Sequence, residues 1–358
     1  MNRAKVPTTD SEMYRTMQRQ PADVRRLLTE GAAQVRQAAD LLQGARRYVF
    51  TGVGTSYHAA LAGSWLFRSA GFDAVAINAA DIWLYPDTWS IGKGDAVVVL
   101  AHTGARLSSA AALDVARTAG ATVISIGSTT AEHEGSQLIL RTIERETSAA
   151  YTSSHLCAMT VLAQLAIELA GRAGTGRVDG WSEALATIPD AVTNVLARED
   201  EVFTVARQIV GRAIYATGAG PSEVSALELV IKAREAALVP VDALPLEQFM
   251  HGPMVAVNAG DVIVLVRVAG NAAGRAAEAA MMWASLGIDL WIVGDPVEDV
   301  DALGQFWLPE LPEPLSMLLT VVPMQMLAWC LAVERGTHPD TFRRDDPEYA
   351  RAFAMMQR

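Results

Sequence analysis

Between residues 47 and 128, short apolar runs alternate with a longer segment whose apolar residues recur at helical spacing. Short continuous apolar runs bounded by turn residues are typical of buried strands, and a 3.6-residue period is typical of an amphipathic helix. Strands that alternate with helices favour an α/β fold with a parallel sheet. The expected strands lie within 48–56, 72–78, 95–104 and 121–128, and a helix is expected over 57–71.

The same pattern returns later in the chain. The turn Thr-Gly-Val-Gly-Thr-Ser at 51–56 matches Thr-Gly-Ala-Gly-Pro-Ser at 217–222, and the Gly-Asp pair at 94–95 matches the pair at 260–261. Both matches have an offset of 166 residues. A constant offset between such distant landmarks indicates a duplicated domain, and the period is too long for a solenoid. The sequence thus predicts two homologous α/β domains, each a parallel sheet flanked by helices.

The 358 residues are enough for two domains with cores of their own. Helical patterns over 152–172 and 180–211 connect the halves, and a polar tail follows a last apolar helix at 315–335. We expect an N-terminal helical segment (1–28), a first domain (29–195), a second domain (196–335) and a C-terminal tail (336–358).

Charge and composition argue against some classes of function. The net charge is −11, and no cluster of Lys and Arg is longer than a pair, which argues against nucleic acid as a partner. Cys157 and Cys330 lie in apolar runs and are expected to be buried free thiols. No Cys or His spacing matches a metal site, and we expect neither a metal nor a cofactor.

Two segments of the sequence indicate where in the cell the protein is expected to be. The N-terminus has no apolar run of the kind found in signal peptides. The apolar run 315–333 has Pro323 and Gln325 at its middle, which favours a buried core helix over a membrane span. We therefore expect a cytoplasmic protein that does not enter a membrane.

Four stretches resemble a known family. They are EMYRTMQRQP (12–21), GVGTSYHAALAGSWL (52–66), ETSAAYTSS (146–154) and ALELVIKAREAALVPVDALPLEQFMHGP (226–253). The chain resembles tandem SIS (sugar isomerase) proteins, in particular the isomerase half of glucosamine-6-phosphate synthase and stand-alone phosphosugar isomerases and deaminases. The resemblance implies flavodoxin-like α/β/α domains. The synthase's glutaminase domain, with its N-terminal cysteine, is expected to be absent.

A glycine-rich turn could anchor a sugar phosphate. Gly54, Thr55 and Ser56 follow an expected strand and precede an expected helix, where backbone amides and hydroxyls can bind an anion. The alternative is a plain strand–helix turn. The corresponding turns of the second half have lost most hydroxyls, so we expect the phosphate in the first half. The third glycine of a dinucleotide-binding fingerprint is missing.

A second turn departs from the family's serine-rich pattern. It reads Ala-His-Thr-Gly-Ala-Arg, and its predicted substrate-binding residues are His102, Thr103, Gly104 and Arg106, with Ser108 as a further hydroxyl. Arg106 could bind phosphate in a bidentate manner, or it could simply face solvent.

Glu235 and Lys232 are the main candidates for chemistry. Three residues apart on an expected helix, they share one face, and a lysine beside a carboxylate keeps it ionised and could stabilise an enediolate. Spacing alone would equally fit a surface ion pair. The resemblance implies that Glu235 is the base that moves a proton between C1 and C2.

The resemblance assigns roles to three more residues. His251, before Gly-Pro, would open the sugar ring. In relatives this histidine reaches the neighbouring subunit's site, which implies a homodimer; a histidine that caps a turn is the alternative. Glu146 and Thr152 would orient the sugar or close the site, although Thr152 could instead cap the following helix.

The sequence therefore predicts an aldose–ketose isomerase for a hexose or hexosamine 6-phosphate. The enzymatic alternatives are deamination of an amino-sugar 6-phosphate and cleavage of a sugar–amine conjugate, which need the same base. The alternative from another class is a non-catalytic sugar-phosphate-binding regulator, which would not need Glu235, Lys232 and His251 together.

Overall fold

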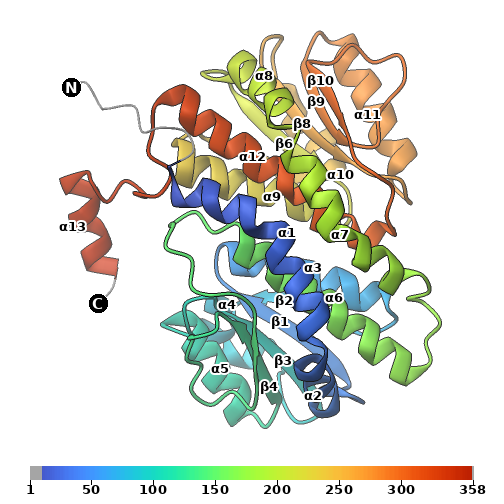
Figure 1. Cartoon of the computed structure of the whole chain (residues 1–358), viewed down its shortest axis with the longest axis vertical. Helices are drawn as coiled ribbons and strands as arrows, with labels where there is room; N and C mark the ends of the chain where they lie inside the picture. The colour runs from blue at the N-terminus through green and yellow to red at the C-terminus, as the bar shows by residue number, and fades with distance from the viewer. Residues whose placement is uncertain (1–9, 357–358) are drawn as a thin grey trace.

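Two five-stranded parallel sheets form the centres of two α/β domains, one above the other in Figure 1. The computed structural model describes residues 10–356. The first sheet has the order β2-β1-β3-β4-β5 and the second β10-β9-β8-β6-β7. Counted from its own first strand, the second sheet repeats the order of the first. This order is that of flavodoxin-like folds, so the predicted fold class and duplication are confirmed.

In the first domain, the strands at the centre of the sheet are apolar and buried, as expected for a parallel sheet covered on both faces. The strand predicted over 95–104 ends earlier, at Leu100, so the following turn is free to line a site. The elements are β1 (Arg47–Gly52), α3 (Thr55–Ser69), β2 (Ala74–Asn78), α4 (Ala79–Leu84), the 3₁₀ turn η1 (Pro86–Thr88), β3 (Asp95–Leu100), α5 (Ser108–Thr118), β4 (Thr122–Gly127), β5 (Ile139–Arg141) and α6 (Ser153–Ala173).

The second domain repeats this order with one change. Its first helix ends in a π-helical turn, which has no counterpart after α3. The elements are β6 (Ile214–Gly218), α9 (Ser222–Lys232), the π turn η2 (Ala233–Ala237), β7 (Val241–Pro245), α10 (Leu246–Met250), the 3₁₀ turn η3 (Pro253–Ala256), β8 (Val262–Arg267), α11 (Ala273–Ser285), β9 (Asp289–Gly294), β10 (Gly304–Trp307), the 3₁₀ turn η4 (Glu313–Leu315) and α12 (Met317–Arg335).

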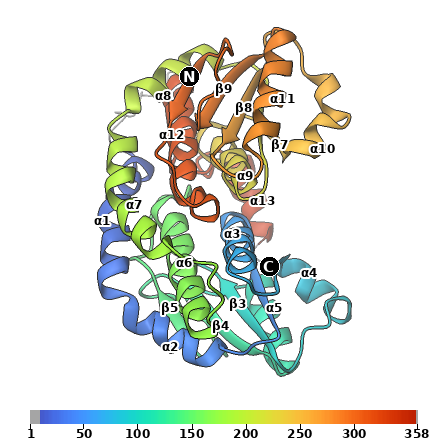
Figure 2. The same cartoon turned by 90° about the vertical axis from the view of Figure 1, so that its right-hand side faces the viewer.

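Further helices lie before, between and after the two repeated units. Ser11 caps the first of them by accepting a hydrogen bond from the Tyr14 amide at 3.2 Å. This helix, α1, packs against α6, α7 and α12, and so contacts helices that cover both sheets (Figure 2). The helical pattern over 180–211 is two helices that break at 197–198. The elements are α1 (Glu12–Glu30), α2 (Ala32–Leu42), α7 (Trp181–Leu196), α8 (Glu199–Ile209) and the C-terminal α13 (Pro347–Met356).

The two most apolar helices lie inside the protein. The apolar window of α6 is 67% buried and that of Glu313–Arg335 is 94% buried, so the prediction of a core helix near 315–333 is confirmed. Gln325, in the middle of α12, accepts a hydrogen bond from Gln20 and donates one to the Thr152 carbonyl at 3.3 Å. These partners satisfy a polar side chain at a fully buried position.

The C-terminal tail folds back across the domain junction before it ends in α13. The Thr337 hydroxyl donates to the carbonyl of Ala236 at 3.0 Å, which ties the tail to the π turn. The carboxylate of Asp340 accepts hydrogen bonds from the amides of Glu12 and Met13, at 2.8 and 2.9 Å, at the start of α1. In the view of Figure 1, α13 projects from one side of the molecule, and its Tyr349 and Phe353 line a cavity together with Leu238 of the second domain.

Candidate functional site

A cavity of about 830 Å³ opens beside the carboxyl ends of β1 and β3. The chain leaves β1 toward β2 on one side and returns to β3 on the other, and ligands of open α/β sheets bind at such switch points. The walls come from the turn 53–56, from Thr103 and Arg106, from the loop around 145–151, from Glu235 of the second domain and from the tail. The cavity therefore needs both domains and the C-terminus.

The turn after β1 has the geometry of an anion site. A Cβ at Gly52 would lie 2.8 Å from the main chain of Ser56, so only glycine allows this close approach of strand and helix. Gly54 has a φ of +60°, and α3 begins at Thr55, so the start of the helix faces the cavity. Gly54, Thr55 and Ser56 all line the cavity, where the sequence predicted them to bind phosphate.

Glu235 reaches the cavity from the π turn. Its carboxylate accepts a hydrogen bond from Lys232 Nζ at 2.7 Å, so the two residues share a face as predicted. The Lys232 side chain is only 1% exposed and that of Glu235 is 21% exposed, which excludes an ordinary surface pair. Burial raises the pKa of Glu235 even though Lys232 opposes the rise, and a carboxylate with a raised pKa at a cavity wall is suited to accept a proton.

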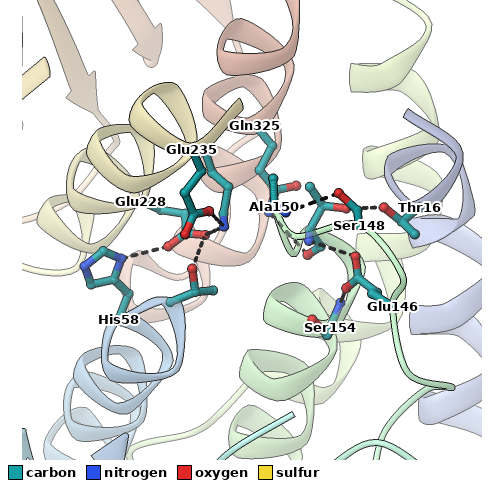
Figure 3. Close-up of polar contacts among 12 residues, drawn as sticks. Thr16, His58, Glu146, Ser148, Ala150, Ser154, Glu228, Glu235 and Gln325 are labelled. Atoms are coloured by element: carbon teal, nitrogen blue, oxygen red, sulfur yellow. Dashed lines mark hydrogen bonds and ion pairs between the residues drawn. The ribbon is translucent and has the colours of Figure 1, made fainter. Parts of the chain in front are cut away.

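Sequence reasoning missed two members of this charge network, Glu228 and His58. Glu228 is fully buried on α9, and its oxygens accept hydrogen bonds from His58 at 2.7 Å and Thr55 at 3.2 Å. Lys232 Nζ lies 3.6 Å away. Figure 3 shows Glu228 and Glu235 on the second domain facing His58 on the first. Burial acts to raise the pKa of Glu228, but His155 and Lys232, with the hydrogen bond from His58, lower it to about 2.

Glu146 forms hydrogen bonds with the main chain at the start of α6. Its carboxylate accepts hydrogen bonds from the amides of Thr152, at 3.1 Å, and Ser154 (Figure 3). Glu146 therefore caps α6, and the idea that the Thr152 side chain caps this helix is wrong. The Thr152 hydroxyl instead lies 2.8 Å from the hydroxyl of Thr16, and Thr152 does not line the cavity.

His102 lies behind the cavity wall. Its Nε2 accepts a hydrogen bond from the Glu146 amide at 3.0 Å, which fixes the neutral tautomer with the proton on Nδ1. Burial and the nearby charge of Arg145 lower the pKa of His102 to about 4. His102 lines a small neighbouring cavity of about 20 Å³ rather than the large one.

Of the other predicted substrate-binding residues at the second turn, some line the large cavity and some do not. Thr103 and Arg106 line the large cavity, as expected for substrate-binding residues. Gly104 has a φ of +103° and packs against Glu132, so it shapes the turn without lining the cavity. Ser108 begins α5 and also lies outside the lining.

His251 is not part of this chain's cavity. It follows α10 on the surface of the second domain, and its side chain is 72% exposed. Its Nδ1 lies 2.8 Å from the Glu247 carbonyl and 3.4 Å from the Glu247 carboxylate. Within one chain, His251 is therefore not brought together with Glu235.

The loop before α6 supplies lining residues that sequence reasoning missed, and the tail supplies others. Arg145 and Tyr151 come from the loop, and Asp340, Phe342 and Arg344 come from the tail. The motif ETSAAYTSS contained Tyr151, but nothing in the pattern distinguished it from a packing residue. Across residues 10–356, no group of three His, Cys, Asp or Glu side chains is arranged to hold a metal ion.

Comparisons with known proteins agree with this architecture. The family model described as SIS domain matches residues 41–168. Over 338 residues, the chain is 26% identical to the glutamine–fructose-6-phosphate aminotransferase [isomerizing] of Thermococcus kodakarensis, and the match covers 92% of this chain and 56% of that protein. The chain thus spans about half the length of the curated relatives it matches.

Two solved structures have the same fold. The C-terminal domain of glucosamine-fructose-6-phosphate aminotransferase from Francisella tularensis matches with a TM-score of 0.84 at 18% identity, covering 92% of this chain and 98% of that one. Tagatose-6-phosphate ketose/aldose isomerase from Escherichia coli matches with a TM-score of 0.78 at 17% identity, covering 95% and 98%. Residues 41–168 are thus identified as a SIS domain. The second sheet of the chain repeats the topology of the first, so the fold of the chain is that of a tandem SIS protein.

Proposed function

We propose that this chain is a phosphosugar aldose–ketose isomerase that acts on a hexose or hexosamine 6-phosphate. The observation that carries the proposal is the position of Glu235. Its carboxylate faces a cavity whose other wall is the glycine-rich turn at 53–56, and it is held there by the buried Lys232. A base opposite an anion anchor is the arrangement that proton transfer on a bound sugar phosphate requires.

The proposed reaction needs one base and one cation. Glu235 would remove the proton from the carbon beside the carbonyl and return it to the former carbonyl carbon. In the same reaction the hydroxyl proton of the first carbon moves to the former carbonyl oxygen, which completes the interconversion of aldose and ketose. The enediolate or enediolamine formed between these steps is electron-rich. The positive charge of Lys232, whose Nζ lies 2.7 Å from the Glu235 carboxylate, would stabilise it. Thr55 and Ser56, with Thr103 and Arg106, would hold the phosphate.

We further infer that the active form is a cytoplasmic homodimer. His251 is exposed and lies outside its own chain's cavity, so its predicted ring-opening role requires a second copy. Cys157 and Cys330 are buried free thiols, as is usual in a reducing compartment.

Proton NMR of the purified protein with a panel of hexose and hexosamine 6-phosphates in D₂O tests the proposal. Deuterium at C1 or C2 is the expected result, because Glu235 would exchange its captured proton with solvent. Release of ammonium would identify the deaminase alternative. Saturable binding without exchange across the panel would contradict an enzyme and favour the sugar-phosphate-binding regulator.

A further inference from the structure

A row of polar side chains leads from the first domain to the proposed base. His58 Nδ1 lies 2.7 Å from the Glu228 carboxylate, and these two residues face each other across the domain junction (Figure 3). Lys232 Nζ lies 3.6 Å from Glu228 and 2.7 Å from Glu235. His58 comes from α3, whereas Glu228 and Lys232 come from α9 and Glu235 comes from the π turn. The row therefore passes from the first domain to the second between His58 and Glu228.

Glu228 lies where water cannot solvate its charge. Its side chain is 0% exposed, that of Lys232 is 1% exposed and that of His58 is 10% exposed. A buried carboxylate without hydrogen-bond donors is costly, so protein groups have to meet its charge. Within residues 10–356, the donors of its hydrogen bonds are His58 and Thr55, at 2.7 and 3.2 Å, and both lie near the start of α3. An ionised carboxylate only accepts hydrogen bonds, so His58 Nδ1 carries the donated proton.

Lys232 is shared between two carboxylates. Its single positive charge cannot neutralise Glu228 and Glu235 together, and its Nζ lies closer to Glu235, at 2.7 Å against 3.6 Å. This unequal sharing is possible because Glu228 already accepts hydrogen bonds from α3. If His58 no longer donated, Glu228 would attract Lys232 more strongly, and Glu235 would lose part of its stabilisation by Lys232.

Other titratable groups face this row. The groups with electrostatic interactions to it are Glu223 on α9 and His155 on α6, with Glu146 and Tyr151 in the loop before α6. The further charged residues that line the two cavities at Glu235 are Arg106, Arg145, Arg234, Asp340, Arg343 and Arg344. In the described part of the chain, none of these groups donates a hydrogen bond to Glu228, so none duplicates the contact made by His58.

We propose that His58 is a positioning residue for the base: from the first domain it holds Glu228, so that Lys232 stays beside Glu235. This inference rests on the proposed function, because it takes Glu235 as the group that accepts the proton. It gives the first domain a part in proton transfer in addition to the binding of phosphate.

The pH dependence of deuterium exchange tests this role. With saturating glucosamine 6-phosphate, or with whichever hexose 6-phosphate of the panel exchanges, the rate should fall at low pH as Glu235 becomes protonated. His58→Ala should move this acidic limb to higher pH by about one unit, because Lys232 would shift toward Glu228 and leave Glu235 less compensated. His58→Asn should restore the profile of the intact protein, because its amide N–H can donate to Glu228 from nearly the same place.

Glu228→Gln should have the opposite effect. Burial raises the pKa of Glu235, and the charge of Glu228 adds to the rise. Removal of that charge leaves Lys232 to Glu235 alone, so the acidic limb should move to lower pH by about one unit. A general loss of structure would not shift the limb in opposite directions for the two partners of one hydrogen bond.

Two controls accompany the variants. Arg68→Gln, at an exposed position on α3 outside both cavities, should leave the profile unchanged. All profiles use the same substrate, so the titration of its phosphate contributes equally to each of them. Calorimetry with that substrate checks that every variant still binds it and is therefore folded.

The outcomes separate this inference from the proposed function. An unshifted limb in Glu228→Gln, or the same shift in His58→Asn as in His58→Ala, would overturn the positioning role while exchange by the intact protein upholds the isomerase. If His58→Ala does not fold, Glu228→Gln decides, because it keeps the shape of the side chain. An absence of exchange by the intact protein at every pH and with every member of the panel would overturn both.

Discussion

At the scale of single residues, burial distinguishes Glu235 and Lys232 from the surface pair that their spacing also fits. Lys232 is enclosed between two carboxylates, those of Glu228 and Glu235, and only Glu235 reaches the cavity. The spacing of three residues was visible in the sequence, but the exposure of each side chain was not. Glu228 was therefore overlooked, although it lies in the same motif.

Glu235→Gln should abolish deuterium exchange while sugar phosphate still binds. The amide keeps the shape of the side chain but cannot accept the proton, so we expect a rate loss of about 10²–10⁴-fold and a Kd within a few-fold of the original. Exchange by NMR and affinity by calorimetry measure the two effects. Glu30→Gln, at an exposed position on α1, is the control. If exchange and binding were lost together, Glu235 would be a structural residue.

His102 should make stability depend on pH. Its pKa is about 4 in the folded protein and about 6.5 when unfolded. Between these values the unfolded chain binds a proton that the folded chain does not, so acidification favours unfolding. From pH 7 to pH 5, His102 should lower the free energy of unfolding by about 2 kcal/mol.

Urea denaturation at the two pH values measures this effect. The His102→Gln variant should lose that share of the pH dependence, because its side chain does not titrate. An equal pH dependence in both proteins would show that His102 does not contribute.

At the scale of elements, two local irregularities shape the site. The π turn after α9 carries Glu235 to the cavity, and π-helical turns are frequently found at functional sites. The loop before α6 folds back so that Glu146, six residues ahead of Thr152, caps the helix. Helical periodicity predicted both helices, but neither the π turn nor the distant cap has a periodic signature.

Glu146→Ala should destabilise the protein by about 1 kcal/mol, because the amides of Thr152 and Ser154 would lose their acceptor at the start of α6. Thermal or urea denaturation measures the change. Glu144→Ala, at an exposed position two residues earlier in the same loop, should change stability far less. Equal effects of the two substitutions would contradict the capping role.

At the scale of the whole molecule, the site lies at the junction of two duplicated domains. The first domain supplies the glycine-rich turn and His58, and the second supplies Glu228, Lys232 and Glu235. The two domains thus have similar sheets but supply different side chains to the site. The turn at 217–222 of the second domain keeps its glycines, and a Cβ at Gly218 would lie 2.7 Å from the Ser222 main chain, as at Gly52.

A mixing experiment tests whether His251 acts on a second copy. Glu235→Gln and His251→Ala should each be inactive as pure proteins. If the two residues serve one site from different chains, co-refolded mixtures should regain part of the exchange activity, because each heterodimer contains one intact site. A mixture that stays inactive although heterodimers form would contradict the shared site. Sedimentation analysis checks that dimers form.

The sequence by itself determined the class of fold, the duplication, the glycine-rich turn before α3 and the pairing of Glu235 with Lys232. These features depend on local periodicity and on short spacings, which a chain displays before it folds. Only the tertiary structure decided that Glu228 and His58 meet across the domain junction, that Glu146 caps α6, and that Arg145 and Arg344 line the cavity with Arg106. The contact between His58 and Glu228 joins residues 170 positions apart along the chain, and no local pattern encodes which side chains will be buried together.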